Sequence, residues 1–139
     1  MKNKNIGVLV SILSPLPLDI EKSSARRRFL RHLKGFKEDF DLEGEYIRKE
    51  FGEKAPDGSL KVIKNVFQFT KENRKLAEEK FNTLNDLSIE IDWSGEEKDK
   101  EVVVEILEGL LVKEKEAKEF NNDKAEYIFV LEEILEELK

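Results

Sequence analysis

The chain has 139 residues, the usual length of a single domain with one hydrophobic core. Charged residues make up 40% of it and apolar residues 39%, so a modest core must lie under a highly charged surface. It has no cysteine, which excludes disulfides, cysteine nucleophiles and zinc sites built from thiolates. Its formal net charge of −6 disfavours approach to the phosphates of nucleic acid.

The N-terminal segment has a basic start and a short apolar run at residues 6–13, which resembles the apolar part of a signal peptide. Pro15 and Pro17 follow the run in place of the small residues of a cleavage site. No segment approaches the roughly 20 apolar residues that span a membrane. We therefore expect a cytoplasmic protein that makes no membrane contact.

Apolar residues recur at helical spacing in five segments, which predict helices over residues 4–14, 24–51, 71–85, 98–112 and 123–138. Ser23 and Ser24 are candidate N-caps of the second helix, and Asp123 opens the last one in a capping-box pattern. The second helix has the clearest stripe, within an arc of about 60°. Its members are Phe29, Leu33, Phe36, Phe40, Ile47 and Phe51.

Two further segments have the pattern of strands. Residues 60–69 are rich in Val, Ile and Phe, and residues 87–93 alternate apolar with polar side chains. We predict that the two strands pair as a small antiparallel ribbon. The expected fold is mainly α with a small β element (α+β), with about five helices around one core in a single domain over residues 1–139.

The charges are unevenly distributed along the chain. Residues 21–37 hold seven basic residues and one acidic residue, a net charge of +6, whereas residues 96–139 hold fifteen acidic and seven basic residues, a net charge of −8. Cations in the first turn of a helix oppose its macrodipole, so an anion or an acidic surface is expected to compensate them.

The candidate contact residues for a partner or an anion are therefore Arg26, Arg27, Arg28, Arg31 and Lys34. On the predicted helix Arg27, Arg31 and Lys34 share the outer face, and Arg26 and Arg28 lie on its flanks. The alternative is that these arginines pair internally with the acidic C-terminal helices.

Phe129 is a further candidate contact. It lies opposite the apolar stripe of the last predicted helix, among Glu132, Glu133 and Glu136. An exposed Phe in acidic surroundings suits a contact with a partner protein, although single exposed apolar residues are also normal. Both interpretations stay open.

The chain lacks the sequence patterns of known catalytic sites. His32 is the only histidine, and we expect it to be structural. The glycines are scattered and form no phosphate-binding loop. Glu90 and Asp92 offer the best carboxylate group for a metal-dependent nuclease, but the next Glu and Lys come after Gly95, where a helix is predicted to start. We expect no catalytic residue, no cofactor and no metal, and hence a protein that is not an enzyme.

Several short motifs are spread over most of the chain. They are Ser24-Ala25-Arg26 before Phe29-Leu30, Asp57-Gly58, Ile89-Glu90-Ile91-Asp92 and Asn122-Asp123-Lys124-Ala125-Glu126. In this combination the chain resembles a family of small uncharacterised proteins encoded by phages and prophages of Gram-positive bacteria. The resemblance implies a phage origin and a setting in the host cell cytoplasm. It also adds interest to the arginines at 26–31, because a Ser-x-x-Arg helix start is part of the pattern.

The lack of a catalytic set and the two-signed surface, together with what the resemblance implies, predict a small phage-encoded accessory protein that binds a host or phage protein. One alternative is a nucleic-acid-binding protein that uses the arginines at 26–31, with an affinity that falls steeply with salt. A second alternative is an inhibitor whose acidic C-terminal half mimics DNA. A homo-oligomer is also open, because the stripes of the second and last helices suit a dimer seam as well as a core.

Overall fold

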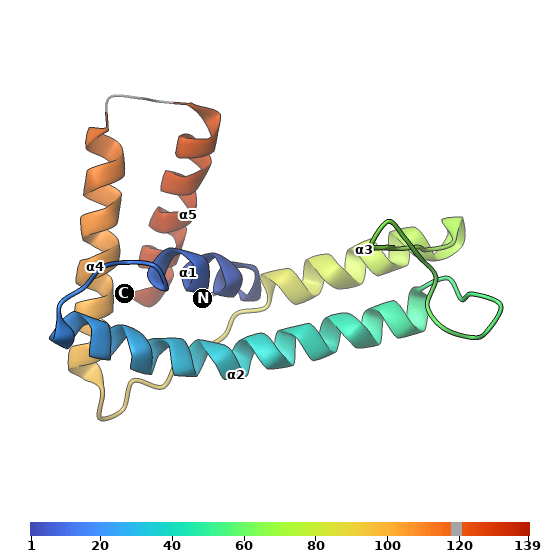
Figure 1. Cartoon of the computed structure of the whole chain (residues 1–139), viewed down its shortest axis with the longest axis horizontal. Helices are drawn as coiled ribbons and strands as arrows, with labels where there is room; N and C mark the ends of the chain where they lie inside the picture. The colour runs from blue at the N-terminus through green and yellow to red at the C-terminus, as the bar shows by residue number, and fades with distance from the viewer. Residues whose placement is uncertain (118–120) are drawn as a thin grey trace.

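The computed structural model describes residues 1–117 and 121–139, which form five α-helices and one two-stranded antiparallel ribbon (Figure 1). A short 3₁₀ turn, η1 (Asn3–Asn5), precedes the first helix. The elements are α1 (Ile6–Leu13), α2 (Ile20–Phe51), β1 (Val62–Ile63), β2 (Val66–Phe67), α3 (Lys71–Asp86), α4 (Glu97–Glu116) and α5 (Asn122–Leu138). The prediction of a mainly α fold with a small β element is confirmed.

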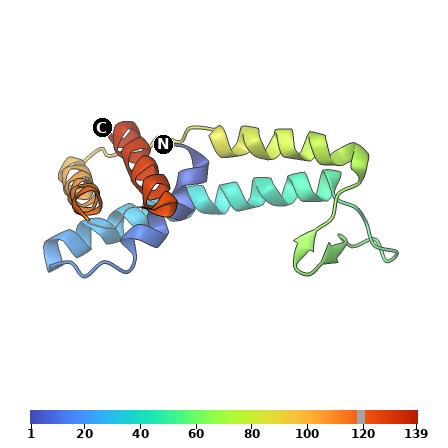
Figure 2. The same ribbon diagram turned by 90° about the horizontal axis from the view of Figure 1, so that it is seen from above.

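The longest helix, α2, links the two parts of the molecule. Its 32 residues span roughly 48 Å at 1.5 Å per residue. The N-terminal half lies against α1 and α4, with α5 packed on α4, and the C-terminal half extends away from these helices alongside α3 (Figures 1 and 2). We call residues 38–86 the distal arm and the remainder the body. One continuous helix thus belongs to both.

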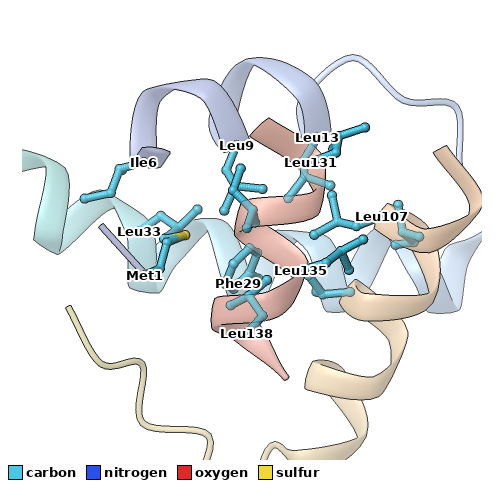
Figure 3. Packing of buried hydrophobic residues seen from close by; sticks show 13 residues of the cluster. Met1, Ile6, Leu9, Leu13, Phe29, Leu33, Leu107, Leu131, Leu135 and Leu138 are labelled. Atoms are coloured by element: carbon cyan, nitrogen blue, oxygen red, sulfur yellow. The ribbon is translucent and has the colours of Figure 1, made fainter. Parts of the chain in front are cut away.

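The hydrophobic core lies in the body, where apolar side chains of α1, α2, α4 and α5 meet (Figure 3). Phe29 and Leu33 of α2 are fully buried there, as their place in the predicted stripe requires. The cluster consists of Met1, Ile6, Leu9, Leu13, Phe29, Leu33, Val103, Ile106, Leu107, Leu131, Ile134, Leu135 and Leu138. This cluster fixes the positions of the four body helices.

Burial along the α2 stripe decreases toward the distal arm. Phe40, Ile47 and Phe51 are only half-buried, because α3 is the helix that covers this part of α2. Ala77 and Leu84 of α3 are buried against α2. Two helices side by side cannot enclose a core as four helices do, so the arm leaves much of its apolar surface in water.

The predicted pairing of residues 60–69 with residues 87–93 is wrong. Residues 60–69 form the ribbon by themselves, with Val62 opposite Phe67 and Ile63 opposite Val66. A two-residue turn closes the ribbon, and both its residues have left-handed backbone angles, with φ values of 51° and 64°. Two strands joined by such a turn pair more readily than strands separated by a helix, because they close a much shorter loop.

Residues 87–93 form no strand but an extended segment that pairs with the N-terminus. The Ile89 amide donates to the Met1 carbonyl oxygen at 2.6 Å, and the Asn3 amide donates to the Leu87 carbonyl oxygen at 2.9 Å. The alternation of apolar and polar side chains in this segment therefore does not arise from pairing in the predicted ribbon. Ile89, Ile91 and Trp93 pack against the body core from an extended chain.

Helix ends also differ from the predicted ones. α2 begins at Ile20, and its N-cap is Asp19, whose carboxylate accepts from the Lys22 amide at 2.9 Å. α4 continues to Glu116, four residues beyond the predicted end at residue 112. The N-cap of α5 is Asn121 instead of Asp123. At the starts of α2 and α5 the sequence holds several residues that are able to cap, so the pattern alone does not identify the N-cap.

Two glycines give opposite predictions for substitution by alanine. A Cβ at Gly35 meets nothing within 4 Å, so Gly35→Ala is expected to raise the free energy of unfolding by about 0.5–1 kcal/mol. A Cβ at Gly52 lies 2.8 Å from Leu60 Cδ2 and nearer still to the Arg48 carbonyl oxygen. Gly52→Ala is therefore expected to lower it by about 1–3 kcal/mol. Urea unfolding followed by circular dichroism measures both, and equal shifts would contradict the backbone geometry at Gly52.

Candidate functional site

The position of the α2 N-terminus changes the electrostatic argument about the arginines. Because α2 begins at Ile20, its first turn holds Glu21 and is capped by Asp19. Arg26 to Arg28 lie almost two turns further on, where the field of the helix end has largely decayed. No anion is needed to compensate them at the helix start.

Arg26 holds the end of α1 and the connector that follows it. Its Nη1 donates to the carbonyl oxygens of Leu13 at 2.9 Å and Leu16 at 2.5 Å, and its Nη2 lies 3.2 Å from Ser23 Oγ. The last carbonyl groups of a helix have no partner within the helix, so a guanidinium satisfies them effectively. The structural role of Arg26 thus accounts for its hydrogen bonds.

Arg28 forms a bidentate ion pair with Asp99 in the first turn of α4. Nε lies 2.5 Å from Oδ2, and Nη2 lies 2.8 Å from Oδ1. The hydrogen bonds from Arg28 lower the pKa of the Asp99 carboxyl, and those to Asp99 raise the pKa of the guanidinium. One turn later on α2, His32 Nε2 lies 2.7 Å from Glu96 Oε2. For Arg28, the internal pairing with an acidic C-terminal helix is the observed state.

The lowered pKa of Asp99 predicts a loss of stability in acid. The unfolded chain holds this proton more tightly than the folded chain, so the ion pair stabilises the protein above the unfolded pKa of about 3.9. That contribution is lost as the pH falls through the lower, folded pKa. Asp99→Asn should therefore show a shallower acid-side fall in the free energy of unfolding than the wild type.

Urea unfolding between neutral and acid pH measures this difference, and Arg28→Gln is the matched background. In that background, Asp99→Asn should change the pH dependence much less, because the partner of the carboxylate is gone. An unchanged acid slope in the single variant Asp99→Asn would contradict the role of the ion pair.

Arg27, Arg31 and Lys34 remain on the solvent side of α2. All three are exposed and follow one another at helical spacing, on the face turned away from Phe29 and Leu33. The five predicted contact residues therefore divide into two groups. Arg26 and Arg28 make internal contacts, and the other three form an exposed basic stripe.

Phe129 is 64% exposed on α5, as its place opposite the apolar stripe predicts. It lies on a different helix from the basic stripe, so the predicted contact residues form two separate surface features and no single site. Its role as a partner contact stays a prediction.

The carboxylates considered for a metal site are not assembled into one. Glu90 is exposed on the extended segment, and the Asp92 carboxylate accepts a hydrogen bond from the Ser94 amide at 2.9 Å. Hydrogen bonds from Ser94 lower the pKa of Asp92. Within the described residues, no group of three or more His, Asp or Glu side chains is placed to hold a metal ion.

The structure reveals a groove on the distal arm that the sequence did not predict. It has a volume of about 400 Å³, and α2 and α3 form its two sides. Tyr46 and Leu87 line it and are 58% and 52% exposed. The lining residues are Glu43, Tyr46, Ile47, Glu50, Lys80, Thr83, Leu84 and Leu87. The sequence pattern that could have indicated the groove is the pair Leu42 and Tyr46, large side chains one turn apart that lie outside the α2 stripe.

No family model, curated protein or solved structure matches this chain. The resemblance to phage-encoded proteins therefore stays a prediction. Within residues 1–117 and 121–139, every helix is too short or too polar to cross a membrane.

Proposed function

We propose that this is a non-enzymatic interaction protein that binds an amphipathic helix of a partner protein in the groove between α2 and α3. The observation that carries the proposal is the exposed apolar surface around that groove. Tyr46 and Leu87 line the groove and are more than half exposed, and Leu42, one turn before Tyr46 on α2, is half exposed. They lie on an arm where two helices pack side by side. A third helix laid on them would complete a three-helix bundle and bury these side chains.

The charges beside the groove indicate the chemistry of the partner helix. Residues 38–50 of α2 hold six acidic and two basic residues, a net charge of −4. Glu43 and Glu50 are exposed members of this set and line the groove itself. A partner helix with apolar residues on one face and Lys or Arg along the edge nearest α2 is complementary to this site. The resemblance to phage-encoded proteins makes a host or phage protein the expected partner.

The proposal is tested with a groove variant and a control variant of matched chemistry. Tyr46→Ser with Leu87→Ser removes two exposed apolar side chains from the groove, and Phe129→Ser removes one from α5. In affinity capture from a Gram-positive host lysate, a protein retained by the wild type should be lost with the groove variant and kept with the control. The captured protein should then bind through a basic amphipathic helix, mapped by hydrogen exchange.

Two results would overturn the proposal. One is a partner that both variants lose equally, and the other is a partner whose contacting segment is acidic or not helical. Circular dichroism of the variants serves as the folding control, because all three substituted side chains are exposed.

The second candidate function is nucleic-acid binding, which the exposed stripe of Arg27, Arg31 and Lys34 favours. Three phosphate contacts predict a logarithmic salt slope of roughly −2.7, far below that of an extended DNA-binding surface. Arg27→Gln with Arg31→Gln should then abolish a gel shift at low salt. A wild-type protein that gives no shift would exclude this function.

A further inference from the structure

The β1–β2 ribbon exposes apolar side chains on both of its faces. Neighbouring residues of a strand point to opposite faces, so the Val62–Phe67 pair lies on one face and the Ile63–Val66 pair on the other. These four side chains are between 39% and 59% exposed. Figure 2 shows the ribbon standing to one side of α2 and α3 at the far end of the arm. The ribbon is therefore an exposed apolar projection far from the body core.

The chain segments around the ribbon are basic, although the protein as a whole is acidic. Residues 48–75 hold eight basic and four acidic residues, a net charge of +4, which leaves −10 for the rest of the chain. Between Asp57 and Glu72 the charged residues are Lys61, Lys64 and Lys71. Glu53, one of the four acids, already faces Lys61 at 3.3 Å.

We propose that the tip of the distal arm binds an anionic lipid surface, with the ribbon in the boundary between headgroups and acyl chains. A flat protein surface covers one face of a ribbon, whereas this boundary surrounds both faces. Lysine side chains around the ribbon reach lipid phosphates while their stems stay with the apolar residues. This inference uses a different surface from the helix groove and does not depend on it.

Other occupants fit the ribbon less well. A second copy of the chain would bring two ends of charge +4 together. Nucleic acid is bound mainly by cations and polar groups at the phosphates, but the outward side chains of both strands are apolar. The expectation of no membrane contact rested on the absence of a spanning segment. Interfacial binding needs no such segment, because a few apolar side chains enter only the boundary layer.

The acidic residues nearest the tip lie on the distal arm itself. Outside residues 48–75, the arm carries −5 over residues 38–47 and −2 over residues 76–86, and the body carries −3. The acids at 38–45 are 6 to 13 residues from Phe51, roughly 9–20 Å along α2, which is at least about one Debye length at physiological ionic strength. Salt therefore weakens their effect at the tip, where the local charge is +4.

The test uses the full chain and sedimentation with vesicles of phosphatidylcholine, with or without phosphatidylglycerol. The wild type should bind the anionic vesicles at least about tenfold more tightly than the neutral ones, with an affinity that falls as salt rises. Ile63→Ser with Val66→Ser should weaken binding to the anionic vesicles by about tenfold or more. Leu76→Ser on α3 is the matched control, 48% exposed on the same arm, and should bind as the wild type does.

A second measurement places the ribbon directly at the membrane. In a Val66→Trp variant with Trp93→Phe, the fluorescence should shift to shorter wavelength when anionic vesicles are added, because the indole leaves water. An absence of sedimentation with anionic vesicles, or equal losses in the ribbon variant and in Leu76→Ser, would overturn the proposal. Binding of the wild-type protein to duplex DNA in a gel shift, without binding to vesicles, would also overturn it.

Discussion

Phe29→Ala is expected to lower the free energy of unfolding by about 3–5 kcal/mol. Phe29 is fully buried where α2 meets the other body helices, and its ring stacks on Trp93 at 5.3 Å between centroids. Truncation removes this contact and leaves a cavity. The four helices and the extended segment around it are held in place by their other contacts and cannot move together to close it. Such a loss is a large fraction of the roughly 5–15 kcal/mol that stabilises a typical domain.

Phe129→Ala is the matched control, because it removes the same group from a side chain that is 64% exposed. Its effect should lie within about 0.5 kcal/mol. Trp93 is the only tryptophan, so its fluorescence during urea unfolding reports on the site next to Phe29. Similar effects of the two substitutions would contradict the placement of the core around α2.

The periodicity of apolar residues predicted the helices well but not the division into body and arm. Phe29 and Phe51 belong to one unbroken stripe, yet the first is fully buried and the second only half-buried. A stripe records which face of a helix is apolar and not how many helices cover it. That number depends on where the chain turns, and here the short turn at Lys64 and Asn65 and the extended segment 87–93 decide it.

Residue type indicated the candidate site only in part. Arg27 and Arg28 look equivalent in the sequence, but Arg28 finds Asp99 at a separation of 71 residues and Arg27 stays in water. Long-range pairing of this kind depends on the angle at which α4 meets α2. The groove was missed for a related reason, since Leu87 was assigned to a strand and its place at the end of α3 follows from the tertiary fold.

Backbone amides of the distal arm are expected to exchange with solvent at least roughly 100-fold faster than those of the body helices, a gap of about 3 kcal/mol in opening free energy. Exchange through local opening depends on how much buried contact must be broken. In the arm, Ala77 and Leu84 are the buried apolar residues, whereas thirteen such residues form the body cluster. Hydrogen exchange with mass spectrometry should show a boundary within α2, between Leu33 and Gly44.

Gly44→Ala offers a way to move that boundary. A Cβ at this position lies 3.4 Å from Arg48 Nη1, an ordinary van der Waals contact, so the change should favour the helix by about 0.5–1 kcal/mol and slow exchange within the arm. Gly35→Ala, placed in the body half of α2, should slow arm exchange less. Uniform protection along α2 would mean that the arm unfolds together with the body. If the arm opens locally, a partner helix bound in the groove should slow exchange in residues 38–86 and leave exchange in the body unchanged.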